Sequence, residues 1–337
     1  MAGVRPAQAG AAADGAGRGA FRRSLVIPVY RNEENLPSLL AALEALDREL
    51  GGGLEVLCVV DGSPDRSAEL LIAAADRVPF ALRVICHSRN FGSFTAIRTG
   101  MEFASGNAIA VMAADLQEPP ELIVQFFATL ESGEADVVFG QRSGRHDAFV
   151  RDALSGLFWW VYRRFVIPDV PRGGVDMFAV SREAATAVLR IEEPNSSLVA
   201  QLFWIGFRRR FVPYVRRARE HGTSAWGFAR RMRYMMDSIF SFSDWPILFV
   251  LWFGIAGCVL SFLFGSFILL ARLFGLIHVP GYAGLAALVA FSGSASLAVQ
   301  GVLGSYLWRT FENTKRRPLR IVARVVDNAL LTKRIEA

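Results

Sequence analysis

The feature that most limits the fold of this chain is an uncharged apolar run from Ile247 to Ala271. A run of this length can cross a bilayer as a tilted helix, whereas a buried helix of a water-soluble protein seldom needs it. A second uncharged run extends from Val279 to Trp308 and is more polar. Its small residues favour close helix packing, either within one chain or between copies in a homo-oligomer. We therefore predict two transmembrane helices within residues 247–308.

Basic residues flank both apolar runs, whereas the loop between them carries only Arg272. By the positive-inside rule, both flanks face the cytoplasm. We therefore expect a multi-pass protein of the inner (plasma) membrane, with its soluble domain and both termini cytoplasmic. The formal net charge of +6 then belongs at a membrane surface, and nucleic acid is not an expected partner. The flanking residues are Arg208–Arg210, Arg216, Arg217, Arg219, Arg230, Arg231, Arg233, Lys315, Arg316, Arg317, Arg320 and Arg324.

Residues 24–140 alternate between short apolar runs and helix-forming segments. This alternation indicates βαβ units, and the nearly continuous apolar strands indicate a mainly parallel sheet covered on both faces. Such sheets bind ligands at the carboxyl ends of their strands, where this chain has Asp61, Arg89, Asp115 and Arg142. The expected strands are 24–30, 54–60, 82–87, 107–114 and 135–140, and the expected helices are 33–49, 66–76, 92–104 and 119–131.

The composition shifts divide the chain into five parts. We expect a disordered tail at 1–23, which has no apolar run typical of a signal peptide, and an α/β domain at 24–225. An amphipathic juxtamembrane segment at 226–246, the membrane helices at 247–308 and a basic cytoplasmic tail at 309–337 follow.

Two further groups of residues have ordinary interpretations. Residues 148–167 mix aromatic side chains with arginines, which fits a core-facing helix and a helix at the membrane interface equally well. The three cysteines, Cys58, Cys86 and Cys258, form no metal-binding or disulfide pattern. We expect them to be small buried hydrophobic residues in a reducing compartment.

Four motifs follow one another in the α/β part: IPVYRNEENL, VVDGSPDRS, RNFGSFTAIRTGMEFASG and VMAADLQEPPELI. Together they resemble family 2 glycosyltransferases of the GT-A fold, which has a Rossmann-like, mainly parallel sheet with flanking helices. More narrowly, the chain is similar to polyprenyl-phosphate and dolichyl-phosphate sugar synthases, several bacterial members of which carry two C-terminal membrane helices. The resemblance covers residues 24–310 and implies a nucleotide-sugar donor and a lipid-phosphate acceptor.

The resemblance also implies the nucleotide site. Asp61 corresponds to the second acidic residue of the family's DDGS motif and would accept a hydrogen bond from the base, expected to be uracil. Val60 stands where the family commonly has Asp. The residues implied to bind the nucleotide are Pro28, Tyr30, Glu33, Asp61 and Asp115.

The family's Asp-Ala-Asp motif, which holds Mg²⁺ or Mn²⁺ against the diphosphate, is Ala113-Ala114-Asp115 in this chain. One carboxylate is therefore missing. Mg²⁺ commonly binds one or two carboxylates together with substrate phosphates, so we expect Asp115 and Gln117 to hold the cation. Neutralisation of the diphosphate by arginines is the alternative.

The acceptor phosphate is expected to meet arginines, because guanidinium groups suit phosphate oxygens. Arg142 and Arg145 resemble a basic pair of the family, and Arg216 and Arg219 resemble its RxxRxxGxSKW stretch, in which the usual Lys is Ala225 here. Headgroup binding by the same arginines is a second interpretation.

Asp176 resembles a family residue near the acceptor, so it joins Asp115 as an expected catalytic residue. A lipid phosphate is largely anionic at neutral pH and needs no strong base, whereas a hydroxyl acceptor does.

We therefore expect an inverting glycosyltransferase that moves a hexose-type sugar from a UDP-linked donor to a polyprenyl phosphate, for cell-envelope polysaccharide. The cation and Asp115 would stabilise the departing diphosphate. One alternative is transfer to a hydroxyl of a glycolipid or polysaccharide. Another is a non-catalytic family member that partners a membrane protein, since Val60 and Ala113 replace two acidic residues.

Overall fold

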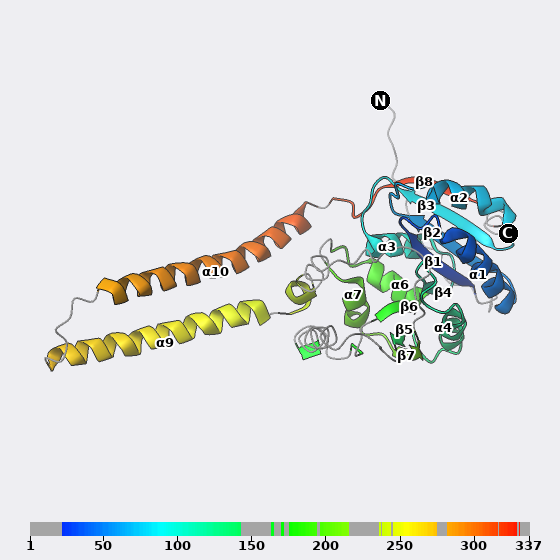
Figure 1. The fold of residues 1–337 in the computed structure, drawn as a ribbon. Coiled ribbons are helices and arrows are strands. Elements are labelled where there is room, and N and C mark those ends of the chain that lie inside the picture. The colour runs from blue at the N-terminus through cyan, green and yellow to red at the C-terminus, as the bar shows by residue number, and fades with distance from the viewer. Residues whose placement is uncertain are drawn as a thin grey trace, which may run out of the picture.

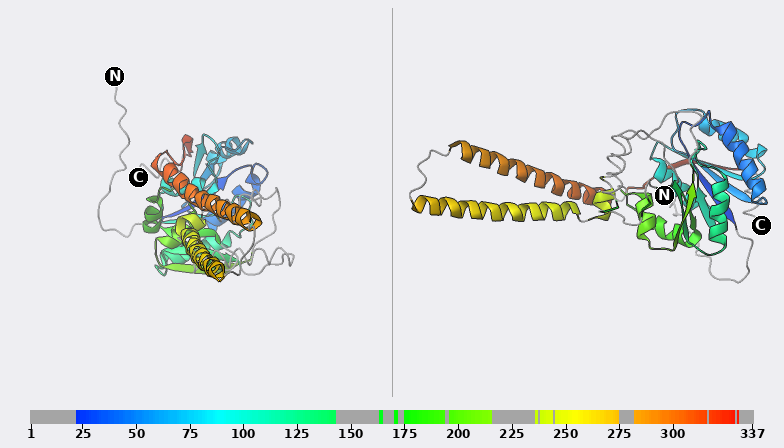
Figure 2. Two further views of the ribbon diagram at one scale, coloured as in Figure 1. Left: turned by 90° about the vertical axis from the view of Figure 1, so that its left-hand side faces the viewer. Right: turned by 60° about the horizontal axis from the view of Figure 1, so that its bottom comes forward.

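The computed structural model describes residues 22–142, 163–164, 170–171, 175–193, 196–215, 236, 238–243, 245–274, 282–315, 317–328 and 330. These residues form an α/β domain from which two long helices extend side by side (Figures 1 and 2). The elements are β1 (Arg23–Val29), α1 (Leu36–Glu49), β2 (Leu54–Val60), α2 (Ser67–Ala74), the 3₁₀ turn η1 (Ala75–Arg77), β3 (Ala81–His87), α3 (Ser93–Phe103), β4 (Ala108–Val111), α4 (Glu121–Glu131), β5 (Val137–Arg142), β6 (Val175–Ser181), α6 (Arg182–Leu189), α7 (Leu198–Trp204), β7 (Arg209–Tyr214), α9 (Trp245–Leu273), α10 (Tyr282–Thr314) and β8 (Val322–Asp327).

The strands form one eight-stranded sheet in the order β7-β5-β6-β4-β1-β2-β3-β8. The four strands β4, β1, β2 and β3 are parallel, as the alternation predicted. Strand β6 is antiparallel to both of its neighbours, and β8 is antiparallel to β3. The strand order reverses between β1 and β4, which is the place where open α/β sheets bind their ligands.

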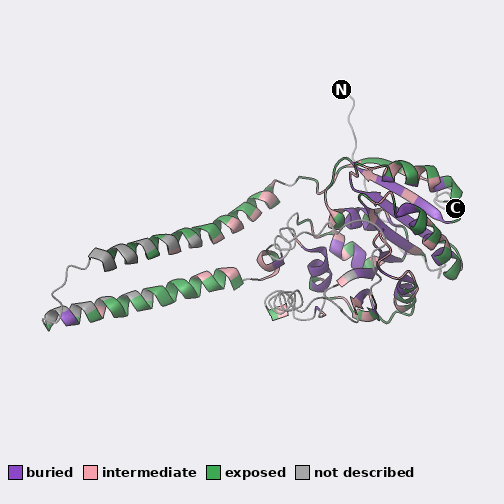
Figure 3. Ribbon diagram, in the orientation of Figure 1, coloured by how far each residue is buried: buried purple, intermediate pink, exposed green. Residues whose placement is uncertain are grey.

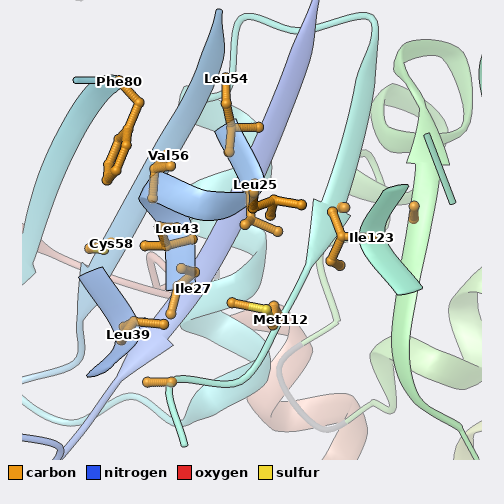
Figure 4. Close-up of a cluster of buried hydrophobic side chains, with 14 of the residues drawn as sticks. Leu25, Ile27, Leu39, Leu43, Leu54, Val56, Cys58, Phe80, Met112 and Ile123 are labelled. Atoms are coloured by element: carbon orange, nitrogen blue, oxygen red, sulfur yellow. The ribbon is translucent and has the colours of Figure 1, made fainter. Parts of the chain in front are cut away.

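Helices cover both faces of the sheet, because side chains alternate between the faces along each strand. Leu25 and Ile27 of β1 join one core with α1, α2 and α4, whereas Val26 joins a second core with α3, α6 and α7. Figure 4 shows part of the first core, and Figure 3 shows that buried residues concentrate in the α/β domain. Cys58 lies in the first core, where burial raises the pKa of its thiol to about 12, as expected for an inert cysteine.

Helix α1 begins at Leu36, later than the predicted residue 33. Asn32, which would cap a helix that began at residue 33, instead accepts the Tyr30 N–H with its side chain at 3.1 Å. Arg31 turns the chain through a left-handed conformation with φ 55°. The helix then starts with Pro37 in its first turn, where a proline is favoured.

Helices α9 and α10 overlap the two predicted ranges, although α10 begins and ends later than the range 279–308. Among the described residues, one helical segment, Trp245–Phe264, is long and apolar enough to cross a membrane. Its mean hydropathy is 2.5 and none of it is buried, as the exposed surface of α9 in Figure 3 shows. Within the same described residues, α10 does not meet this criterion.

The prediction of a basic tail at 309–337 is wrong for residues 322–327, which form β8 at the edge of the sheet. This segment, VARVVD, is rich in the β-branched residues that favour strands. It pairs with β3, whose edge would otherwise leave backbone groups unpaired. The chain therefore returns from α10 to the α/β domain.

Candidate functional site

Two strained backbone positions mark the carboxyl edge of the sheet. Arg31 (φ 55°) follows β1 and Leu116 (φ 51°) follows the adjacent strand β4. No other non-glycine residue in the described part of the chain has a positive φ. This conformation costs about 1–3 kcal/mol at such residues and clusters at functional sites. Strain and topology therefore point to the same place, the reversal between β1 and β4.

The loop after β1 is held by the loop after β2. Three consecutive amides of the first loop donate to side chains of the second, and Arg66 N–H donates back to Glu33 Oε2 at 2.9 Å. Burial raises the pKa of Asp65, but hydrogen bonds from Ser63, Ser67 and the Glu33 amide outweigh this effect and lower it. The three bonds are Arg31 N to Ser63 Oγ (2.8 Å), Asn32 N to Ser67 Oγ (3.3 Å) and Glu33 N to Asp65 Oδ2 (3.1 Å).

The residues predicted to line the nucleotide pocket lie beside these loops. Pro28 is half-buried within β1, and Tyr30 follows the strand with 36% of its surface exposed. The Arg31 guanidinium lies 5.5 Å from the centre of the Tyr30 ring. Glu33 lines a cavity of about 330 Å³ together with Arg31, Glu34, Asn35, Pro64 and Asp65. Carboxylates predominate in this lining, so it suits a base or ribose better than a diphosphate.

Asp61 is buried at the end of β2, with 2% of its surface exposed. Its Oδ1 accepts the Phe91 N–H and pairs with His87 Nδ1, each at 2.8 Å, and its Oδ2 accepts the Gly92 N–H at 2.7 Å. An ionised carboxylate only accepts, so His87 Nδ1 carries a proton, while His87 Nε2 lies 2.9 Å from Thr99 Oγ1. This geometry disagrees with the predicted contact between Asp61 and a base. Asp61 instead holds the loop of residues 88–92.

Gly62 lets the same loop pack closely against the end of β2. Its φ is +58°, and a Cβ atom there would lie 2.2 Å from the Arg89 carbonyl carbon and 2.4 Å from the Asn90 nitrogen. Both neighbours are backbone atoms, which cannot move aside as a flexible side chain can. A glycine is therefore required on two independent grounds.

We expect Gly62→Ala to lower the free energy of unfolding by about 2 kcal/mol or more, because the alanine is both strained and in collision with the loop. Thermal unfolding of the full-length protein in detergent would measure the change. Gly52→Ala is the matched control, since Gly52 has φ +85° but nothing within 4 Å of its Cβ position. Equal losses in the two variants would show that strain alone acts and that the close contact with the loop is unimportant.

Asp115 follows β4 and is half-buried, as are Ala113 and Gln117. The Gln117 N–H lies 3.4 Å from Asp115 Oδ1 across the left-handed Leu116. No group of three His, Cys, Asp or Glu side chains that could hold a metal occurs among the described residues. Asp115 and Gln117 supply hard oxygen donors, so they fit Mg²⁺ or Mn²⁺ only when substrate oxygens complete the coordination.

The backbone places Arg142 and Asp176 at the same edge of the sheet. Arg142 is the last residue of β5, which runs in the direction of β4 because both strands are antiparallel to β6. Strand β6 starts at this edge, and Asp176 lies two residues before Phe178, the partner of Val111. Arg145, Arg216 and Arg219 lie outside the described residues, as do most residues of the 148–167 segment.

Sequence reasoning missed the side chains that organise the loops. His87, Ser63, Asp65 and Ser67 were not singled out, although each follows or ends a strand of the predicted sheet. The segment SPDRS combines turn residues with small hydroxyl and carboxylate acceptors, a composition suited to capturing backbone amides of a neighbouring loop.

Comparison with known proteins identifies the family. Residues 24–187 match the family described as "Glycosyl transferase family 2". An uncharacterised glycosyltransferase of Synechocystis sp. is 32% identical over 89% of this chain and 94% of its own length. The chain belongs to glycosyltransferase family 2. It is therefore a glycosyltransferase, with an α/β fold of the GT-A type.

The names of two other relatives include a lipid: undecaprenyl phosphate in one and bactoprenol in the other. The undecaprenyl-phosphate 4-deoxy-4-formamido-L-arabinose transferase of Pseudomonas paraeruginosa is 34% identical over 91% of this chain and 91% of its own length. The prophage bactoprenol glucosyl transferase homolog of Escherichia coli K12 is 28% identical over 90% of this chain and 98% of its own length. Both matches extend well beyond residues 24–187.

Proposed function

We propose that this glycosyltransferase moves a sugar from a nucleotide-sugar, UDP-linked, to a polyprenyl phosphate at the cytoplasmic face of the membrane. The observation that carries the proposal is the extent of the match to the two relatives named for undecaprenyl phosphate and bactoprenol. It covers 91% and 90% of this chain, which is more than the α/β domain alone. The likeness therefore includes helices as well as the strand-edge site.

The proposed membrane attachment uses α9 and α10 as two transmembrane helices at 247–308. They follow the α/β domain at 24–225 and the amphipathic juxtamembrane segment at 226–246. Aromatic and cationic side chains pair at the domain ends of both helices. Arg164 lies 5.8 Å from the Trp245 ring at the start of α9, and Lys315 lies 5.2 Å from the Trp308 ring near the end of α10. Tryptophan beside a cation is typical of the membrane–water interface, which supports a first span that begins and a second span that ends at this level.

The donor would bind at the reversal between β1 and β4. Pro28, Tyr30 and Glu33 would contact the nucleoside, and the loop held by Asp61 would close one side of the site. Asp115 and Gln117 would hold Mg²⁺ or Mn²⁺, which supplies positive charge against the departing diphosphate when it is bound.

The acceptor would bind on the β5 and β6 side of the same edge. Arg142, Arg145, Arg216 and Arg219 would hold the lipid phosphate through guanidinium hydrogen bonds. A phosphate oxygen held there would attack the anomeric carbon on the side opposite the diphosphate, so the configuration of that carbon inverts. A homo-oligomer, packed through the small residues of α10, remains compatible with this arrangement.

We expect Asp176→Asn to keep kcat within about tenfold of the wild-type value, because a phosphate acceptor is already anionic and needs no general base. The measurement is kcat and KM with undecaprenyl phosphate at neutral pH. A loss of about 100-fold or more with acceptor KM unchanged would contradict a phosphate nucleophile and favour a hydroxyl acceptor, for which a base contributes about that much.

The function itself is tested with the full-length protein in detergent, radiolabelled UDP-sugars and undecaprenyl phosphate. The expected result is a labelled lipid that forms only when both substrates and a divalent cation are present. Label transfer to a glycolipid or polysaccharide without any lipid-phosphate product would overturn the proposed acceptor. An absence of nucleotide release with every UDP-sugar and GDP-sugar, with Mn²⁺ and without it, would indicate the non-catalytic alternative.

A further inference from the structure

We infer that the C-terminal segment 317–328 is a positioning element for the donor site, because it connects α10 to the loop that Asp61 holds. The inference depends on the proposed function only for the identity of the nucleotide. The contacts themselves belong to the α/β domain, and they fall into two groups at the two ends of β8.

The C-terminal end of β8, far from the site, is anchored to the start of β3. Arg83 donates two hydrogen bonds to the Asp327 carboxylate, from Nε at 2.7 Å and from Nη2 at 2.8 Å. Asn328 is 2% exposed, and its side chain accepts from Leu82 N and donates to the carbonyl oxygens of Ala75 and Phe80. A buried amide with all of these partners fixes the strand at one register.

The N-terminal end of β8, near the site, pairs with the last residues of β3. The pairing runs regularly as far as Cys86 with Arg324 and then shifts, so that His87 pairs with Val322. The irregularity is of the kind that bends a strand and re-aims side chains next to active sites. Beyond it, the Ser88 N–H donates to the Ile321 carbonyl at 3.0 Å.

A second contact holds the residue before Ile321. Arg320 forms an ion pair with Glu102 of α3, the helix that follows the loop. The loop of residues 88–92 is thus held at its start by the C-terminal segment and at its end by Asp61, which accepts from the Phe91 and Gly92 amides. His87 links the two supports, since its ring contacts Asp61 and its backbone pairs with Val322.

The loop carries side chains that a donor could meet. Arg89 is exposed, and its guanidinium stacks 4.3 Å from the centre of the Phe91 ring. A short link, residues 315–320, separates Ile321 from the end of α10 at Thr314. The segment that holds the loop therefore follows α10 directly in the sequence.

Asp327→Ala in the full-length protein tests this inference, with Asp136→Ala as the matched control. Each carboxylate receives two hydrogen bonds from one guanidinium, and Asp136 also accepts the backbone N–H of Arg208. The exposed fractions are similar, at 26% for Asp327 and 19% for Asp136. Asp136 lies just before β5, at the edge of the sheet opposite the site. Removing its carboxylate should therefore affect stability without changing the loop of residues 88–92.

We expect Asp327→Ala to speed hydrogen exchange at the amides of residues 88–92 and to raise the Kd of UDP at least about fivefold, whereas Asp136→Ala changes neither. Unchanged exchange in Asp327→Ala, or equal changes in both variants, overturns the inference. Faster exchange confined to Asp327→Ala with an unchanged Kd for UDP also overturns it, because the loop would then not position the donor. If the wild-type protein binds no UDP, the proposed donor fails; the exchange comparison and the Kd of the nucleotide that does bind then decide the inference.

Discussion

Asp115→Asn is expected to lower kcat/KM for sugar transfer by about 100-fold or more, because removing one group that stabilises developing charge has effects of this size. The chain has Ala113 at the position of the family's other carboxylate, so Asp115 is the one acid within residues 113–115. Asp115 is half-buried in a loop rather than in the core, so the thermal unfolding temperature should change little. Steady-state kinetics over a range of Mn²⁺ concentrations measure the effect.

Two further variants make the Asp115 result specific. Gln117→Ala is expected to raise the Mn²⁺ concentration needed for half-maximal activity about tenfold. The effect is smaller than that of Asp115→Asn because an amide oxygen is a weaker ligand than a carboxylate. Asp76→Asn is the control, since Asp76 is exposed in η1 and lies away from the site. Near-wild-type activity of Asp115→Asn would remove the metal from the proposal and leave arginine side chains to neutralise the diphosphate.

Asp61→Ala is expected to lower the free energy of unfolding by about 3 kcal/mol or more. The substitution leaves His87 buried without its partner and removes the acceptor of two backbone amides. The released loop should also raise the KM for the donor. Thermal unfolding in detergent and donor kinetics, measured on the same preparation, report the two effects.

The result separates two roles for Asp61. A residue that only contacts the base would lose donor binding without a change in unfolding, and that outcome would restore the sequence-based prediction. Thr99→Val serves as a milder variant, because it removes the hydroxyl partner of His87 Nε2 and leaves Asp61 in place. It should cost about 1 kcal/mol of stability.

The parallel part of the sheet was predictable because its signals are local. Strands such as Leu54–Val60 are buried along their whole length, so a continuous apolar run sufficed to identify them. The carboxyl edge followed from topology alone, and Asp115 and Arg142 do lie there. The strained turns at Arg31 and Leu116 could not be predicted, since neither residue type favours a positive φ. At Arg31, a tertiary hydrogen bond from its N–H to Ser63 Oγ holds the turn.

The role of Asp61 and the existence of β8 escaped the sequence for a related reason. Asp61 is enclosed by residues about thirty positions away, and β8 pairs with a strand far earlier in the chain. Arg320 and Arg324 also follow closely on Lys315, Arg316 and Arg317, so nothing in the sequence separates them from that basic run. Their β-branched neighbours were the better signal, because a strand needs only an available sheet edge to form.

The two long helices leave the α/β domain and return to it. Near the domain, side chains of α10 contact Phe240, which precedes α9. The Arg309 guanidinium lies 5.2 Å from the Phe240 ring, which also meets the Tyr306 ring at 5.2 Å. A domain tethered by one helix would swivel freely about its stalk. If α9 and α10 both span the membrane, as proposed, a domain held at two points would keep one side turned toward the lipid headgroups, and the height and tilt of its site above the bilayer would become part of the catalyst's specificity.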